Sequence, residues 1–359
     1  MRVTRACYGD ISLYSPGPAG CRIDLSDNTN LWGFPPAAAR EIGRADAETV
    51  TRYPQAYSSL LKDALSEYVG VPAAMVVTGC GSDDTLDSAI RAFAEPGELL
   101  AHPDPTFPMV PKFARMNGVV SVAVPLTSSY DVDVDAMLAT GARIIYVCSP
   151  NNPTGTLVTR AAIETILAGA GAGNQVVIVD EAYAEYSGES VIDLVASSER
   201  LLVVRTMSKA FGLAGLRVGY AVGAPALVAE VEKSRGPYKV NALASLAAVA
   251  ALGEGLEWVR EHIALTIDHR ARLTSEFQNR GLSPIPSAAN FVLVPVRGAP
   301  SIARNMRERG IAVRCFEKLP QLSGALAESD GAALRFSIGP WELLCEALIA
   351  FDAARSECE

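Results

Sequence analysis

Short β-branched, apolar runs alternate with longer segments rich in Ala and Leu through the first two thirds of the chain. The runs occur at residues 74–78, 98–101, 119–124, 143–148, 175–180 and 201–205. Segments between them, such as 82–94 and 160–169, have helical length and apolar spacing. The pattern predicts an α/β fold, a mostly parallel sheet flanked by helices, with the ligand crevice beyond the carboxyl ends of the strands.

The character of the sequence changes near residue 242. A long helical stretch, 242–280, is broken around Gly253 and Gly255, and strand-like segments follow at 290–296 and 334–338. Because 359 residues exceed the usual size of one domain, we expect more than one. We predict an N-terminal arm at 1–30, a large domain at 31–245 and a smaller C-terminal α+β domain at 246–359.

Charge and composition limit the possible partners. A formal net charge of −9 without a basic run argues against nucleic acid or an anionic membrane surface. The N-terminus lacks an apolar signal-peptide core, and the apolar run at 242–252 is too short to span a bilayer. We therefore expect a soluble, cytoplasmic protein. Seven cysteines without a Cys-x-x-Cys pair, and only three histidines, predict reduced thiols and no metal site.

Lys209 is the most informative residue for predicting the chemistry of the site. It follows the apolar run 201–205, and a glycine-broken turn leads from it to Arg217. A lysine amine in this position suits a carbonyl cofactor, with which it could form an imine, and Arg217 could hold a phosphate on that cofactor. Asp180 ends the neighbouring run and could face a ring nitrogen. Together these residues predict a pyridoxal 5′-phosphate (PLP) site.

A glycine turn provides a second candidate for phosphate binding. The run 74–78 leads into Gly79-Cys80-Gly81-Ser82-Asp83, after which a helix is expected. Free backbone N–H groups and the positive helix end would then meet at Ser82 and Asp83. The alternative, and the commoner case for such a turn alone, is that Ser82 is only a helix N-cap.

Three residues could act on the cofactor ring. An ionised Asp180 would keep the pyridine nitrogen protonated, so that the ring accepts electrons when a Cα bond breaks. Tyr183 and Asn152, the latter in Ser149-Pro150-Asn151-Asn152-Pro153, could donate hydrogen bonds to the phenolate oxygen of the ring. The alternatives are a cap or turn role for Asp180 and a plain Asn-Pro turn for Asn152.

Four further residues are candidates. Phe107 either stacks on the cofactor ring or anchors its loop in apolar packing. Arg335, in the apolar run 334–338, either binds a substrate carboxylate or phosphate or lies on a strand surface, and Arg314 is a second candidate of the same kind. Tyr53 lies in a loop where exposed packing is the default.

Several motifs together resemble the fold-type I PLP-dependent aminotransferases, most closely the histidinol-phosphate aminotransferase family, from about Asp24 to the C-terminus. The motifs are Arg52-Tyr53-Pro54, Gly81-Ser82-Asp83, Ser149-Pro150-Asn151-Asn152-Pro153-Thr154-Gly155, Asp180-Glu181-Ala182-Tyr183, Ser208-Lys209-Ala210-Phe211, Gly215-Leu216-Arg217 and Leu334-Arg335-Phe336. Chance agreement of so many spaced motifs is negligible.

The resemblance implies a role for each matched residue. Lys209 binds PLP and moves the proton at Cα, with Asp180 and Tyr183 assisting. The phosphate is held by the backbone of Ser82 and Asp83, by the side chains of Ser208 and Arg217, and by Tyr53 of a partner subunit, which implies a homodimer. Phe107 matches a stacking position. Arg335, Arg314 and Asn28 fall where the substrate is bound.

This chain also departs from the family pattern. Its segment Asp27-Asn28-Thr29-Asn30-Leu31 has Thr29 where the family usually has an acidic residue and Leu31 where it has proline. Pro340 stands where threonine is usual. Because these positions lie on the substrate side, transamination is the firmer expectation, with histidinol-phosphate-like or aromatic amines and a 2-oxo acid such as 2-oxoglutarate as substrates. The alternatives are a threonine-phosphate-type PLP decarboxylase and a non-catalytic PLP-binding protein.

Overall fold

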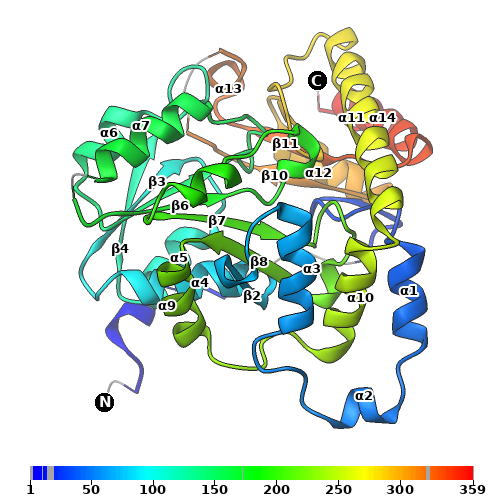
Figure 1. Ribbon diagram of the computed structural model, residues 1–359. Coiled ribbons are helices and arrows are strands. Elements are labelled where there is room, and N and C mark those ends of the chain that lie inside the picture. The colour runs from blue at the N-terminus through cyan, green and yellow to red at the C-terminus, as the bar shows by residue number, and fades with distance from the viewer. Residues whose placement is uncertain (1–2, 10, 14–19, 172, 321–323, 359) are drawn as a thin grey trace.

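A seven-stranded sheet forms the centre of the fold in the computed structural model, which describes residues 3–9, 11–13, 20–171, 173–320 and 324–358 (Figure 1). Residues 1–2, 10 and 14–19 of the predicted arm lie outside this part. The strand order is β2-β8-β7-β6-β5-β3-β4. The strands are β2 (Val76–Cys80), β3 (Leu99–Asp104), β4 (Val120–Pro125), β5 (Ile144–Cys148), β6 (Val176–Asp180), β7 (Leu201–Thr206) and β8 (Val218–Gly223).

The pairing confirms a mostly parallel sheet. β8 alone runs antiparallel to its neighbours, β2 and β7, so the other six strands share one direction. All six predicted strands are present within a few residues of their expected ends. The predicted helices at 82–94 and 160–169 are α4 (Gly81–Phe93) and α7 (Arg160–Gly171). Strand β8 was not predicted.

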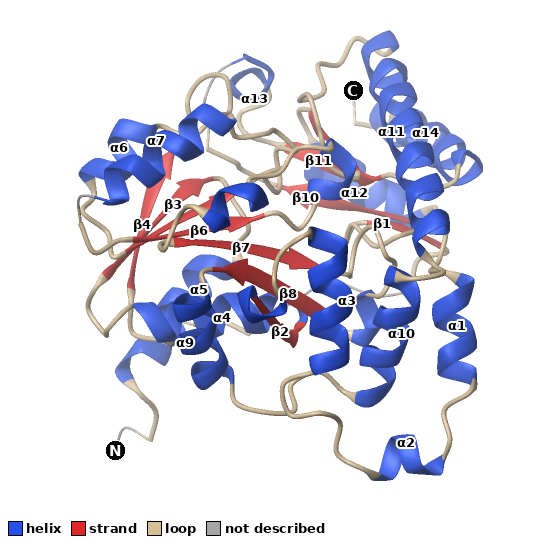
Figure 2. Ribbon diagram, in the orientation of Figure 1, coloured by secondary structure: helices blue, strands red, loops and turns tan. Residues whose placement is uncertain are grey.

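Helices cover both faces of this sheet (Figure 2), which explains why its inner strands β5, β6 and β7 are buried throughout and mostly apolar. Val177 and Val179 face one core, whereas Ile178 faces the other, as the two-residue period of a strand requires. The first core is closed by α3 (Ser59–Val69), α6 (Val134–Ala139), α7 and α10 (Ala242–Leu252). The second is closed by α4, α5 (Met109–Met116) and α9 (Pro225–Arg235).

A second, four-stranded sheet has the order β1-β10-β11-β9. It consists of β1 (Ile23–Leu25), β9 (Phe291–Pro295), β10 (Ile311–Phe316) and β11 (Ala333–Ser337), and it packs against α11 (Leu256–Asn279), α12 (Ala299–Glu308) and α14 (Trp341–Ser356). β1 belongs to the predicted arm, yet it pairs in parallel with β10, with Ile23 opposite Ile311. The end of that segment is therefore part of this sheet.

The predicted break in the long helical stretch separates α10 from α11. Of the described helices, none is by itself long and apolar enough to cross a membrane; α10 and α11 together have the length and composition, and a bend of 76° lies between them. Ala247, Ala248 and Ala251 of α10 are buried in the core of the large sheet. The predicted boundary at residue 245 falls inside this helix, and the division into domains stays a prediction.

The remaining elements are short. They are α1 (Pro36–Gly43), α2 (Ala47–Thr51), α8 (Ala184–Ser187), α13 (Gly324–Glu328) and the 3₁₀ turns Ala6–Tyr8, Ala73–Met75, Ile192–Ala196 and Ala214–Leu216.

Candidate active site

The candidate residues gather where the large sheet meets the small one. Asp180 ends β6, and Lys209 follows the end of β7, so parallel pairing brings both to one edge of the sheet. Residues from the small sheet and its β1 segment reach the same place. The Lys209 Nζ donates to the Asp27 carbonyl at 3.1 Å, and the Arg335 Nη1 donates to the Asn152 Oδ1 at 2.5 Å.

The Lys209 amine has an environment that favours its neutral form. Burial lowers the pKa of Lys209 from 10.5 to about 8, and the positive charge of Arg335 contributes in the same direction. Its Nζ also lies 5.9 Å from the centroid of the Tyr183 ring. A substantial fraction of the amine is therefore unprotonated just above neutral pH, as a nucleophile requires.

Asp180 is a buried carboxylate with an exposed fraction of 3%. Its Oδ2 accepts a hydrogen bond from the Tyr146 hydroxyl at 2.9 Å, and its Oδ1 accepts one from the Ala182 N–H at 3.1 Å. Burial raises the pKa of Asp180 to about 6, against the lowering effect of these two hydrogen bonds. The carboxylate is thus mostly ionised at pH 7. The N-cap position of α8 is Tyr183, so the cap alternative for Asp180 is wrong. The hydrogen bond to the Ala182 N–H agrees with the turn alternative, which does not exclude a role in the site.

Tyr146 is a site residue that our sequence analysis missed. It lies on β5 two residues before Cys148, which is opposite Asp180 in the pairing of β5 with β6. Residues two apart on a strand share a face, so the phenol points to the same face as Asp180. A tyrosine inside an otherwise apolar run, at that spacing, was the available signal, because a buried hydroxyl needs a polar partner.

Tyr183 is held by the segment that carries Asn28. The Asn28 Nδ2 donates to the Tyr183 hydroxyl oxygen at 3.1 Å, and the Asn28 N–H donates to the Ser337 Oγ at 2.9 Å. Asn28 is buried, with a left-handed φ of 58° that asparagine tolerates better than most residues. Burial raises the pKa of Tyr183 to about 12, so its hydroxyl keeps its proton and can donate it in a hydrogen bond.

The turn at the start of α4 forms a cradle, which we define as the backbone of Gly81, Ser82 and Asp83 together with Ser208 and Arg217. The Arg217 Nη1 lies 3.5 Å from the Ser208 Oγ, and its Nη2 lies 3.5 Å from the Asp83 Oδ2. Ser82 is not the N-cap, because Cys80 holds that position and makes no side-chain cap hydrogen bond. The N-cap alternative is therefore wrong.

Two glycines allow the cradle to close. A Cβ at Gly81 would lie 2.4 Å from the Arg217 Nη2, and a Cβ at Gly219 would lie 2.2 Å from the Ser82 nitrogen. Gly81 also has a left-handed φ of 79°, and a Cβ at Gly219 would meet backbone, so glycine at both positions lets the guanidinium and the first N–H groups of a helix converge. Such a convergence suits an anion, and a phosphate group in particular.

Arg335 and Arg314 come from neighbouring strands of the small sheet. Arg335 is 6% exposed, so it is not a surface arginine; its Nη2 donates to the Ser26 carbonyl at 2.7 Å. Its guanidinium carbon lies 5.1 Å from the centroid of the Phe291 ring. Arg314 on β10 is directly opposite Arg335 on β11, and residues opposite each other share a face of the sheet. Two cations therefore lie on one face.

Phe107 and Tyr53 make no hydrogen bond or ion pair with the other candidate residues among the described contacts. Phe107 follows β3 at the same edge as Asp180, and it packs, partly buried, against the core under α4 and α5. This packing agrees with the apolar-anchor alternative, and stacking on a cofactor stays a prediction. Tyr53 is 84% exposed in the loop between α2 and α3, with its ring centroid 5.0 Å from that of Tyr238.

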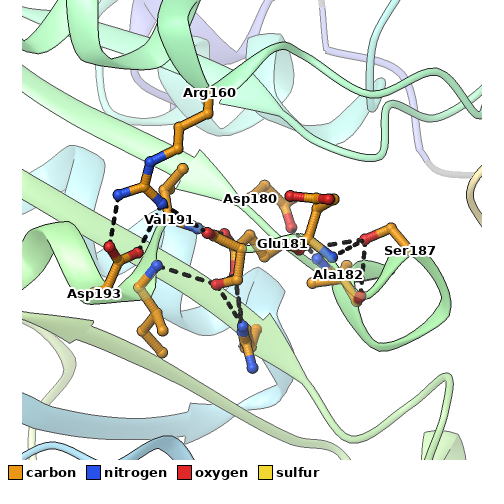
Figure 3. Close-up of polar contacts among 12 residues, drawn as sticks. Arg160, Asp180, Glu181, Ala182, Ser187, Val191 and Asp193 are labelled. Atoms are coloured by element: carbon orange, nitrogen blue, oxygen red, sulfur yellow. Dashed lines mark hydrogen bonds and ion pairs between the residues drawn. The ribbon is translucent and has the colours of Figure 1, made fainter.

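A buried ion pair supports the ends of β6 and β7 from the opposite face. The Glu181 carboxylate accepts hydrogen bonds from the Arg205 Nε at 3.0 Å, the Arg205 Nη2 at 2.8 Å, the Ser190 Oγ at 2.7 Å and the Val191 N–H at 2.7 Å. Figure 3 shows Glu181 beside Asp180, with the nearby pair of Arg160 and Asp193 at the surface. This network, which the sequence analysis also missed, fixes the strand ends that carry Asp180 and Lys209.

Comparisons with known proteins agree with this geometry. The family model for class I and II aminotransferases matches residues 22–342. The histidinol-phosphate aminotransferase of Thermoanaerobacter pseudethanolicus is 36% identical over 311 residues, covering 85% of this chain and 87% of that protein. That of Roseiflexus castenholzii is 38% identical over 309 residues and 82% of each chain. This chain therefore belongs to the class I and II aminotransferases.

A solved structure gives the same fold. The histidinol-phosphate aminotransferase of Sinorhizobium meliloti, in complex with pyridoxal 5′-phosphate, superimposes with a TM-score of 0.84 at 23% identity and covers 100% of this chain and 99% of that one. The protein is thus a fold-type I, PLP-dependent transaminase. The residues present fit the cofactor, because the glycine-closed cradle has the donors that a phosphate would need, while an amine and an ionised carboxylate lie at the adjacent strand ends.

Proposed function

We propose that this enzyme transfers an amino group between a histidinol-phosphate-like or aromatic amine and a 2-oxo acid such as 2-oxoglutarate. The observation that carries the proposal is the buried Arg335, which is held against Asn152 at the Lys209 end of the site and paired in register with Arg314. Two cations on one face suit an anionic substrate, whether carboxylate or phosphate. Relatives that are 36% and 38% identical bear the name histidinol-phosphate aminotransferase, which supports this substrate class.

The proposed cofactor contacts follow the geometry of the site. The cradle would hold the phosphate through the backbone of Ser82 and Asp83 and through Ser208 and Arg217. Asp180 would keep the ring nitrogen protonated, and Phe107 would lie against the ring. Bound PLP supplies an electron-accepting ring that stabilises the charge left when a bond at Cα breaks.

The chain's own residues account for proton transfer and orientation. The Lys209 amine, with its pKa lowered to about 8, takes and returns the proton at the substrate Cα. Tyr183 and Asn152 would donate hydrogen bonds to the phenolate oxygen of the cofactor ring, and Asn28 orients the Tyr183 hydroxyl. Arg335 and Arg314 orient the substrate through its anionic groups, with Asn28 at the same end of the site.

The proposal includes a homodimer in which Tyr53 reaches the phosphate of the partner subunit, and a cytoplasmic location. The exposed Tyr53 ring supports the homodimer.

The decarboxylase alternative is not favoured, because the named relatives are aminotransferases. A non-catalytic role is not favoured either, because the chain belongs to a transaminase family.

A single-turnover assay tests the proposal. The PLP-loaded enzyme is mixed, without an acceptor, with histidinol phosphate, phenylalanine, glutamate or phosphothreonine, and the carbonyl product and carbon dioxide are measured. We expect about one carbonyl product per subunit from the first or second amine and from glutamate, with no carbon dioxide. Lys209→Ala should abolish product, whereas Lys233→Ala, an exposed lysine on α9, should not.

Two outcomes would contradict the proposal. Carbon dioxide released from phosphothreonine, without carbonyl product from the other amines, would indicate the decarboxylase. Failure of every amine in the panel, with PLP bound, would favour the non-catalytic alternative.

A further inference from the structure

The start of α4 presents an electrostatic conflict. A PLP phosphate carries between one and two negative charges near neutral pH, and the first turn of α4 already contains Asp83 and Asp84. Two carboxylates beside an anion site repel the ligand unless cations neutralise them. Arg217 pairs with Asp83 at 3.5 Å, but the same guanidinium belongs to the cradle, so the charge of Asp84 needs a second cation.

Asp84 cannot simply point away, because it shapes the cradle. Its Oδ2 accepts a hydrogen bond from the Cys80 N–H at 3.0 Å, and its side chain is only 14% exposed. A Cβ at Gly79 would lie 3.0 Å from the same oxygen, which shows how closely the turn wraps around the carboxylate. Asp84 therefore holds the turn from Gly79 to Ser82 and leaves a negative charge close behind it.

Lys239 supplies the second cation. Its Nζ lies 3.0 Å from the Asp84 Oδ1, the oxygen that the turn does not use. The side chain comes from the loop between α9 and α10, far from α4 in sequence, and it is 37% exposed. The pair is thus partly screened from water, where a charge contact has more effect than at the open surface.

The loop that carries Lys239 is itself anchored on both sides. The Tyr238 N–H donates to the Ala56 carbonyl at 2.9 Å, and the Tyr238 ring packs against Tyr53. Asn241 caps α10 by accepting the Ala244 N–H. The backbone on both sides of Lys239 is therefore anchored, and its Nζ reaches Asp84 from this position.

We propose that Lys239 is a positioning residue for the cofactor phosphate: it neutralises Asp84, so that Asp84 can shape the cradle without repelling the phosphate. This inference rests on the proposed cofactor contacts. It assigns a role to a lysine that does not itself touch the phosphate. Its effect should appear with a phosphorylated ligand and not with the same ligand lacking phosphate.

Equilibrium binding to the apoenzyme tests this role. PLP and pyridoxal, which lacks the phosphate, are titrated separately into wild type, Lys239→Met and Lys239→Arg. We expect Lys239→Met to bind PLP about tenfold more weakly at low salt, with a smaller loss at high salt and no change for pyridoxal. Lys239→Arg should behave like wild type. Lys233→Met, which removes an exposed lysine paired with Glu230 on α9, is the matched control.

A double variant separates charge neutralisation from other effects. In Asp84→Asn/Lys239→Met both charges are gone and the amide oxygen can still accept the Cys80 N–H, so PLP affinity should return toward the wild-type value. Three outcomes would overturn this inference while leaving the proposed function intact. Lys239→Met could lose equal affinity for PLP and pyridoxal, it could bind PLP as wild type does, or the double variant could fail to recover PLP affinity. Wild-type apoenzyme that takes up no PLP would instead overturn the proposed function.

Discussion

At the scale of single residues, burial lowers the pKa of Lys209 most, and the positive charge of Arg335 lowers it further. The positive guanidinium disfavours the protonated amine, so removing it should raise the pKa of Lys209 from about 8 toward 10.5. In apoenzyme at a saturating PLP concentration, the rate of PLP uptake should rise with pH around the pKa of the free Lys209 amine. We expect Arg335→Gln to shift this midpoint upward by about half a unit to one unit. Stopped-flow absorbance at pH values from about 6 to about 10 would measure this rate.

The Arg335→Gln prediction has a matched control and a consequence for the pH dependence of stability. Arg304→Gln, an exposed arginine on α12, should leave the midpoint unchanged. Since the unfolded chain holds the Lys209 proton more tightly, this group adds stability to the apoenzyme as the pH rises from about 8 to 10.5. Arg335→Gln should raise the lower limit of this pH range, because it raises the pKa of Lys209 in the folded protein. An unshifted midpoint in this variant would mean that Arg335 does not contribute to the pKa of Lys209.

Single residues also show the limit of local sequence patterns. Lys209, Asp180 and Arg217 were predictable because strand ends and glycine turns are local features. The hydrogen bond from Asn28 to Tyr183 joins residues 155 apart, and that from Arg335 to Asn152 joins residues 183 apart. No local pattern specifies such contacts, and none links Lys239 to Asp84, which are also 155 residues apart.

At the scale of elements, the large sheet was largely predictable and β8 was not. The inner strands β5, β6 and β7 are mostly apolar because both of their faces are buried. β8 contains Gly219 and Gly223, which have low strand propensity, so it lacks the continuous β-branched pattern from which the other strands were predicted. β1 has only three residues, and its pairing with β10 depends on a contact across most of the chain.

Gly219 in β8 gives the prediction at this scale. In Gly219→Ala the new Cβ would lie 2.2 Å from the Ser82 nitrogen and the Gly81 carbonyl carbon, so backbone must move and the cradle with it. We expect PLP affinity to fall by about a hundredfold and the free energy of unfolding by about 1–3 kcal/mol. PLP titration and urea denaturation of the apoenzyme measure the two effects. Gly215→Ala is the matched control, since nothing lies within 4 Å of its Cβ position; wild-type affinity in Gly219→Ala would contradict the proposed cradle.

At the scale of the whole molecule, the position of Tyr53 bears on assembly. Tyr53 is 84% exposed, and Tyr238, Tyr57 and Leu60 are also exposed large side chains from neighbouring segments. An exposed patch of this kind is typical of a surface that another chain covers. If Tyr53 serves the phosphate of a partner, each site needs residues from two subunits, and an isolated subunit should bind PLP weakly. The proposed homodimer therefore has a functional consequence.

Subunit mixing tests this consequence. Lys209→Ala lacks the reactive amine, and Tyr53→Ala lacks the phosphate contact, so each homodimer should be deficient at limiting PLP. If Tyr53 acts across the interface, each mixed dimer regains one site with both residues, and random exchange should restore about a quarter of all sites. Turnover after mixing, together with sedimentation to determine the oligomeric state, is the measurement. A monomer in sedimentation, or no gain on mixing although exchange is verified with tagged subunits, would show that Tyr53 does not act across an interface.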